Sequence, residues 1–235
     1  MAFYPICLDI GGRRCVVIGG GKVAERKVAG LLECGATVSV VSPELSEPLR
    51  CLADRGGINW VARPYQPGDL AGAFLVIAAT DDPAVQEAVH AEAEQGNLLL
   101  NVADVPKWCN FILPATVRRG DLTISVSTAG KSPALAKQLR KNLEKQYTDD
   151  YDLLLQVLGR LRPMVLDLGL PHEKNKIIFE NLLHRDMIDW LRKQNWQALT
   201  AHIRAILGKD VPLDDLIGQA AQKAQMQDEA GVKPA

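Results

Sequence analysis

The sequence lacks the features that mark several large functional classes. Its formal net charge is only −1 over 235 residues, so no excess of charge favours nucleic acid or an anionic membrane as a partner. No apolar run approaches the roughly 18 residues that a membrane-spanning helix needs. Residues 1–5 lack the basic and apolar regions with which a signal peptide begins. We therefore expect a cytoplasmic protein that binds neither nucleic acid nor membrane.

The cysteines and histidines lack the spacing of a metal site. The five cysteines are Cys7, Cys15, Cys34, Cys51 and Cys109. Their number is odd, they are widely separated and no C-x-x-C motif occurs, so neither structural zinc nor a disulfide framework is indicated. His172, His184 and His202 share no metal-ligand spacing either. We predict no metal site, and cysteines that are reduced and mostly buried.

What the sequence does contain is a glycine-rich turn between a strand pattern and a helix pattern. The run Cys15 to Ile18 is apolar and β-branched, which is typical of a buried parallel strand, and residues 23–34 follow as a helix. Between them, Gly19, Gly21 and Ala24 fit the dinucleotide motif G-x-G-x-x-A. In that motif the second glycine lets a pyrophosphate approach the backbone at a helix N-terminus. The alternative is a glycine turn that only packs a strand on a helix.

Strand and helix patterns alternate up to residue 103, which predicts a doubly wound parallel sheet. Further strands are expected at 37–41, 58–62, 74–79 and 98–103, and a helix over 83–95. Glu44, just after the second strand, is either a ribose ligand or a solvated loop carboxylate, and the lack of a following arginine favours NAD over NADP. Asp104 follows the last strand. It is either a catalytic or substrate-orienting carboxylate or a turn-capping residue.

The pattern changes beyond residue 113. We expect a hairpin from the runs 109–117 and 122–127, a helix over 134–147, and only helices between 151 and 207. The hydroxyls of Ser127, Thr128 and Ser132, together with Lys131, lie in one loop that opens a helix. This combination predicts an anion-binding loop, and the alternative is an ordinary capped turn.

Six stretches, taken together, resemble the precorrin-2 dehydrogenase and sirohydrochlorin ferrochelatase family, which includes the N-terminal module of siroheme synthase. They are residues 3–8, 17–27, 77–82, 101–104, 111–114 and 127–136. The resemblance implies an α/β protein with an N-terminal NAD-binding Rossmann domain over 1–113, a central α/β dimerisation segment over 114–147, a C-terminal helical domain over 148–209 and a tail over 210–235. It also implies a homodimer that oxidises precorrin-2 to sirohydrochlorin with NAD. Some members insert Fe2+ as well, so Fe2+ or Co2+ is a candidate chelation substrate.

The resemblance also assigns roles to individual residues. It implies Gly21, Lys22 and Val23 for the pyrophosphate, Pro43 and Glu44 for the adenosine ribose, Thr80 and Asp81 for the nicotinamide side, Asp104 as the catalytic base, and Ser127, Thr128, Lys131 and Ser132 for the substrate. Thr128 stands where some members carry a serine, so the hydroxyl is kept and a methyl group is added.

Basic residues near the serine-rich loop suit a substrate that is rich in carboxylates, or they form a merely solvated face. They are Arg118, Arg119, Lys131, Lys137, Arg140 and Lys141. The rival hypothesis is a catalytically inactive NAD- or tetrapyrrole-binding regulatory module. The presence of Asp104 and of the loop 128–132 argues against it, because a nucleotide sensor would need only residues 15–82.

Overall fold

The computed structural model describes residues 3–208, 213, 215, 217–218 and 220–222, and its contacts divide the chain into two units, Met1–Leu113 and Pro114–Ala235. The predicted tail, residues 210–235, lies almost entirely outside the described residues. Within the part of the chain that the structure describes, none of the helices has the length and apolar character that crossing a membrane requires.

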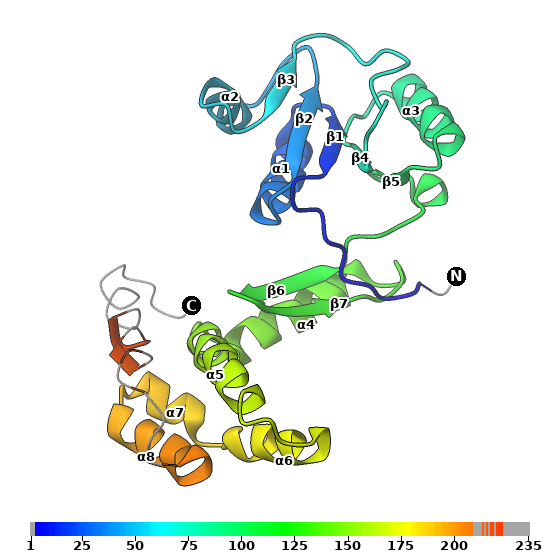
Figure 1. Ribbon diagram of the computed structural model, residues 1–235. Helices are drawn as coiled ribbons and strands as arrows, with labels where there is room; N and C mark the ends of the chain where they lie inside the picture. The colour runs from blue at the N-terminus through cyan, green and yellow to red at the C-terminus, as the bar shows by residue number, and fades with distance from the viewer. Residues whose placement is uncertain (1–2, 209–212, 214, 216, 219, 223–235) are drawn as a thin grey trace. The chain divides into compact units, whose positions relative to one another are not determined.

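The first unit is built on a five-stranded sheet in which every pair of neighbouring strands is parallel (Figure 1). The strands are β1 (Arg14–Ile18), β2 (Thr37–Val41), β3 (Asn59–Val61), β4 (Leu75–Ala78) and β5 (Leu99–Val102), in the order β3-β2-β1-β4-β5. The chain moves outward from β1 to β3 and then returns to the other side of β1. This reversal is the switch point at which doubly wound sheets bind ligands, and it confirms the predicted fold class.

Helices cover both faces of this sheet (Figure 1). They are α1 (Lys22–Glu33), α2 (Glu47–Asp54) and α3 (Pro83–Gln95). Successive strand residues point to opposite faces, so Val17 packs in the core with α1 and α2, whereas Val16 packs in the core with α3. Both side chains are fully buried, and burying a valine stabilises a fold by about 1.5–3 kcal/mol.

Local signals in the sequence set several of the helix ends. The Asp82 carboxylate accepts the N–H groups of Ala84 and Val85 at the start of α3, with Pro83 in the first turn. Gly35, with φ of +73°, follows the end of α1. The sequence analysis missed α2, because that helix has only eight residues and Leu49 is its one fully buried side chain.

The prediction that the cysteines are mostly buried is wrong. Only Cys15 is buried; Cys34 and Cys109 are intermediate, and Cys7 and Cys51 are exposed. Burial raises the pKa of the Cys15 thiol. None of the five, all of which lie in the described part of the chain, forms a disulfide. The error arose because an apolar sequence neighbourhood does not say which face of a helix or loop a thiol occupies.

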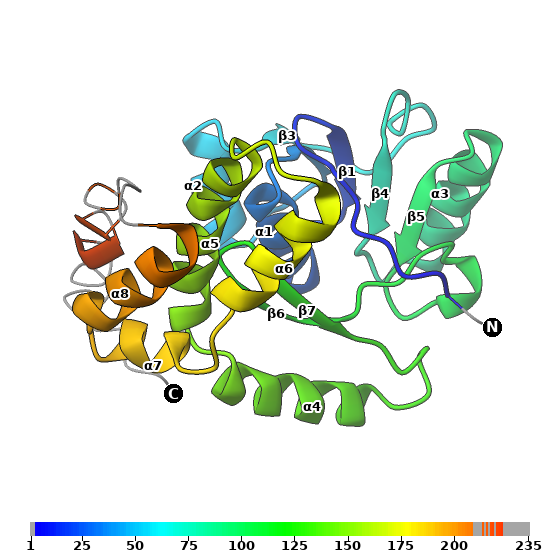
Figure 2. The same cartoon turned by 60° about the horizontal axis from the view of Figure 1, so that its bottom comes forward.

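The second unit begins with an antiparallel hairpin and continues as helices (Figure 2). Its elements are β6 (Ala115–Arg119), β7 (Leu122–Val126), α4 (Pro133–Gln146), α5 (Asp150–Leu166), α6 (His172–Leu182), α7 (Met187–Arg192) and α8 (Trp196–Leu207). Helix α4 packs on the hairpin, and the helices from α5 onward share a core that includes Leu161, Leu191 and Ile203. The predicted hairpin and the predicted run of helices are therefore present. The predicted boundary near residue 147 between a dimerisation segment and a helical domain stays a prediction.

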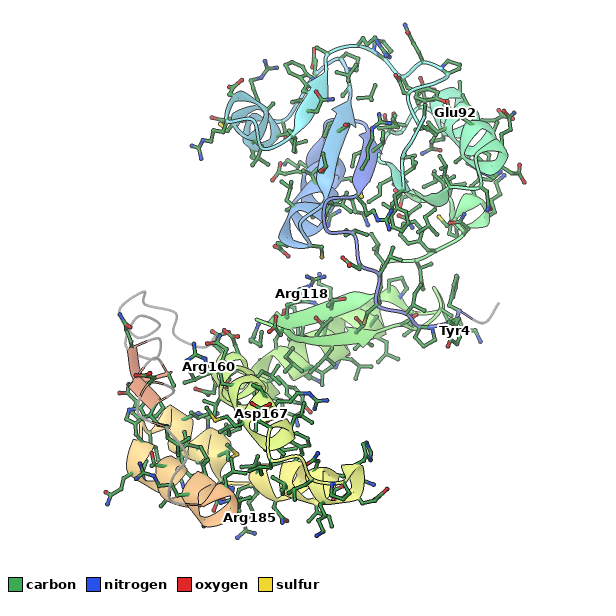
Figure 3. All side chains as sticks on the ribbon, viewed as in Figure 1. Tyr4, Glu92, Arg118, Arg160, Asp167 and Arg185 are labelled. Carbon is green, nitrogen blue, oxygen red and sulfur yellow. The ribbon has the colours of Figure 1, made fainter. Side chains whose placement is uncertain are left out.

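Polar contacts hold the loop that joins β3 to β4. The Arg63 guanidinium donates to both carboxylate oxygens of Asp69, at 2.8 and 2.6 Å. Glu92 of α3, labelled in Figure 3, accepts the backbone N–H groups of Gly68 and Leu70, both at 3.0 Å. The hydrogen bonds from Arg63 hold the pKa of Asp69 below its ordinary value.

This depressed pKa predicts an acid-dependent loss of stability. A carboxylate whose pKa is lower in the folded state stabilises the fold above its unfolded pKa of about 3.9, and that contribution is lost as the pH falls through the folded pKa. We expect Asp69→Asn to lower the urea midpoint at pH 7 and to differ less from the parent at about pH 3. Asp54→Asn, at an exposed carboxylate of α2, is the control. An Asp69→Asn deficit of equal size at both pH values would contradict the prediction.

Candidate functional site

Four of the parallel strands end at the same level of the sheet. Ile18 of β1 lies opposite Val41 and Ala78, and Ala78 lies opposite Val102. The loops that follow these ends are 19–21, 42–44, 79–81 and 103–104. Strands are about 4.8 Å apart, so the outer two of the four are separated by about 14 Å. All the predicted site residues of the first unit therefore lie at the carboxyl ends of the strands or at the start of α1.

The glycine loop shows why three glycines stand in a row. A Cβ on Gly19, whose φ is +108°, would lie 2.5 Å from the Ala79 carbonyl oxygen, and a Cβ on Gly20 would overlap the Glu44 carbonyl oxygen. A Cβ on Gly21 would meet nothing within 4 Å. Gly19 and Gly20 are therefore required by the loops of the neighbouring strands, whereas Gly21 borders open space. The sequence analysis named Gly19 and Gly21 but missed Gly20.

The open side of this loop suits an anion. Gly21 precedes α1 as its N-cap residue, and no side chain caps the helix there. The first amide groups of a helix have no partners within the helix, and the helix dipole adds positive charge at that end. Ala24 is fully buried, as the motif requires for close helix packing. The residues present thus fit a dinucleotide pyrophosphate at Gly21, Lys22 and Val23.

Residues 42–46 fold back over the glycine loop. The Ser46 N–H donates to the Gly20 carbonyl at 2.7 Å, and the Ser46 hydroxyl donates to Glu25 of α1 at 3.1 Å. These bonds place Pro43 and Glu44, both exposed, beside the loop. The structure thus brings Glu44 beside the glycine loop, and its contact with ribose stays a prediction.

The ends of β4 and β5 are joined by a side chain that the sequence analysis missed. Gln86 of α3 is only 8% exposed. Its amide nitrogen donates to the Thr80 carbonyl at 2.7 Å and lies 3.5 Å from the Ala103 carbonyl. Gln86 therefore connects the loop that contains Thr80 and Asp81 to the turn that contains Asp104. The only signal in the sequence was its place in the helical series 86, 89 and 93, of which Val89 and Ala93 are also buried.

Asp104 occupies the turn immediately beyond β5. Its φ is +59°, in the left-handed region, and its side chain is exposed. Lys27 of α1 is half-buried nearby. Burial, with help from Arg26, lowers the pKa of Lys27, while the nearby Cys109 and Asp104 act in the opposite direction. A lysine of α1 and the carboxylate after β5 therefore lie close enough to influence each other's charge, which sequence spacing did not predict.

The predicted substrate loop belongs to the second unit. The Ser127, Thr128 and Ser132 hydroxyl oxygens accept the backbone N–H groups of Ala129, Ser132 and Leu135, respectively, at 3.1, 3.2 and 3.3 Å. Ser132 is the N-cap of α4. The capped turn is therefore present, and each hydroxyl keeps one proton to donate to an anion. Anion binding here stays a prediction.

The predicted basic residues differ in their surroundings. Arg119 pairs with Asp149 at 3.2 Å, and Arg140 pairs with Glu144. Arg118 lies on β6, as Figure 3 shows. Lys131, Lys137 and Lys141 are exposed. No group of three or more His, Cys, Asp or Glu side chains among the described residues is arranged to hold a metal ion.

Comparisons with known proteins agree with this geometry. Residues 6–115 match the family described as "Putative NAD(P)-binding", and residues 119–146 match "Sirohaem biosynthesis protein central". The chain is 40% identical to the siroheme synthase of Nitrosococcus oceani over 78% of this chain and 39% of that protein. It is 33% identical to the siroheme synthase of Zymomonas mobilis over 90% of this chain and 45% of that protein. A solved structure of SirC, precorrin-2 dehydrogenase, matches with a TM-score of 0.73 at 27% identity, over 86% of this chain and 100% of that one.

The chain therefore contains the NAD(P)-binding domain and the central domain of sirohaem biosynthesis proteins, and it is homologous to siroheme synthases and similar in fold to SirC. The resemblance and the Rossmann fold are confirmed as predicted, and the cofactor class is confirmed as a nicotinamide dinucleotide at the level of NAD(P). The chain spans about two fifths of the length of the siroheme synthases that it matches, 39% and 45% in the two cases. The roles of the individual site residues stay predictions, since these similarities do not assign them.

Proposed function

We propose that the chain catalyses the NAD-dependent oxidation of precorrin-2 to sirohydrochlorin. One observation carries the proposal. The glycine loop, which is open and has no side-chain cap, and the turn that contains Asp104 both lie at the carboxyl ends of the parallel strands. The similarity to known proteins supports the substrate class, because the matched solved structure, SirC, is a precorrin-2 dehydrogenase. A binding module without catalysis has no need for a carboxylate held in a left-handed turn at those strand ends.

The proposed mechanism divides the work among the strand-end loops. Bound NAD supplies the hydride acceptor. The amides at Gly21, Lys22 and Val23 would hold the pyrophosphate, Pro43 and Glu44 would contact the adenosine ribose, and Thr80 and Asp81 would border the nicotinamide. Oxidation removes a hydride and a proton from the macrocycle, and the Asp104 carboxylate accepts the proton.

The substrate carboxylates are proposed to meet the loop 127–132. Lys131 is exposed there, and the three hydroxyls can each donate a hydrogen bond. We expect Lys131→Met to raise the KM for precorrin-2 by about threefold to tenfold, the effect of losing one partly solvated charged contact. The kcat and the Kd for NAD should not change. Lys145→Met, at the other end of α4, is the matched control, and an unchanged KM in Lys131→Met would reject this role.

The overall proposal is tested by anaerobic turnover. Enzymatically made precorrin-2 and NAD are mixed with the protein, and sirohydrochlorin absorbance and NADH fluorescence are followed together. Equal amounts of both products are the expected result. No oxidation by a protein that binds NAD in a calorimeter would reject the enzyme and favour the regulatory module.

Three finer predictions accompany the proposal. Fe2+ or Co2+, added after oxidation, is a candidate substrate for chelation, and insertion faster than in a protein-free control would establish that activity. A homodimer is predicted and is tested by sedimentation. The cytoplasmic location is likewise still a prediction.

A further inference from the structure

The turn that contains Asp104 is held in an unusual backbone conformation. Asp104 is one of four described non-glycine residues with a positive φ. Residues other than glycine adopt this conformation uncommonly, although aspartate and asparagine do so more often than most, and contacts from the surrounding structure help to hold it. The groups that help to hold it here are therefore candidates for controlling where the Asp104 carboxylate points.

Besides Gln86, whose amide nitrogen lies 3.5 Å from the Ala103 carbonyl oxygen, the Cys109 sulfur contacts this turn. It accepts the Val102 N–H at 3.2 Å, and it lies 3.3 Å from the Val102 carbonyl oxygen and 3.5 Å from the Val105 carbonyl oxygen. A thiol has one proton to donate and also acts as a weak acceptor. The two carbonyl groups flank Asp104 in the chain, so a single side chain holds both sides of the turn.

The backbone around Cys109 is itself fixed along the outer edge of β5. The Asn110 side chain accepts the Leu100 N–H at 2.8 Å and donates to the Leu98 carbonyl at 2.7 Å. The Asn101 amide donates to the Phe111 carbonyl at 3.1 Å. Residues 109–111 therefore cover the open edge of the sheet, and Cys109 cannot move without breaking these bonds.

We propose that Cys109 is a positioning residue for Asp104. Its thiol contacts the Val102 and Val105 carbonyl groups, one on each side of Asp104 in the chain, and so restricts the direction of the carboxylate. This inference rests on the proposed function, in which Asp104 accepts a proton from the substrate. A general base must lie within hydrogen-bonding reach of its proton, and a shift of about 1 Å can lower a rate by as much as about a hundredfold.

The test uses a conservative pair of substitutions. Cys109→Ala removes both the donor and the acceptor, whereas Cys109→Ser keeps both on a shorter bond. We expect kcat to fall about tenfold in Cys109→Ala and less than about threefold in Cys109→Ser, with the Kd for NAD unchanged in both. Cys51→Ala, at an exposed thiol of α2, is the control for losing a cysteine. All rates are measured well below the melting temperature of each variant.

A double-mutant cycle separates positioning from a general structural role. In an Asp104→Asn background, Cys109→Ala should cause no further loss of the residual rate in single-turnover assays, because its effect runs through Asp104. A further tenfold loss in that background, or a kcat in Cys109→Ala equal to the parent value, would overturn the inference. If the parent protein itself shows no turnover, the proposed function is rejected, and the Cys109 contacts then have no role in catalysis.

Discussion

Replacing Asp104 with asparagine is expected to lower the kcat for precorrin-2 oxidation by about 10² to 10⁴-fold, the usual contribution of a general base. The amide has the size of the carboxylate but cannot accept the proton. Asparagine also tolerates a positive φ as well as aspartate does, so the turn should keep its shape. The Kd for NAD should not change, since the glycine loop and residues 43–44 remain intact.

The measurement is anaerobic turnover under saturating NAD, with NAD binding followed by calorimetry on the same preparations. Asp54→Asn, which changes an exposed carboxylate of the same unit, should keep the activity of the parent. A kcat within about threefold of the parent value in Asp104→Asn would show that Asp104 is not the base. Loss of NAD binding in the same variant would mean that the turn shapes the cofactor site.

The second large effect separates two neighbouring glycines. Gly20→Ala forces a methyl group onto the Glu44 carbonyl oxygen, with the Ser42 hydroxyl only 2.9 Å away. We expect it to lower the free energy of unfolding by about 3 kcal/mol, because the backbone of the loop that follows β2 must move. Gly21→Ala adds its methyl group to open space at a φ of −89°, which any residue adopts. Its stability should stay within about 0.5 kcal/mol of the parent.

Gly21→Ala should instead weaken NAD binding by at least about tenfold, because the methyl group stands where the pyrophosphate approaches the backbone. Denaturation in urea and calorimetric titration with NAD measure the two effects. Gly30→Ala, at an exposed glycine of α1 with nothing near its Cβ position, is the matched control and should bind NAD like the parent. Parent-like affinity in Gly21→Ala would exclude the phosphates from this loop.

Short-range signals in the sequence were enough for most of the fold. Apolar runs between glycine turns predicted the five strands of the first unit, because a strand buried on both faces is apolar along its whole length. The Asp82 and Ser132 caps and the Gly35 helix end each depend only on residues within one helical turn, so they are signals of the same short range. The eight-residue α2 was missed because a helix that short shows little periodicity.

The residues of the candidate site were predicted less evenly. Gly21, Glu44, Thr80 and Asp104 follow strand ends, and parallel strands place all their carboxyl ends at one edge. Gly20 was missed because the atom that leaves no room for a side chain there is the carbonyl oxygen of Glu44, and Glu44 follows a different strand.

The sequence by itself therefore determined the order of the elements, the dinucleotide motif and the carboxylate at the end of β5. Only the tertiary structure decided which residues support them. Gln86 connects two strand ends, Lys27 lies near Asp104, and Cys109 contacts the turn that contains Asp104. The physical reason is the separation along the chain between the residues that interact. A cap or an amphipathic strand is specified by neighbours along the chain, whereas these contacts form only after the sheet has brought distant segments together.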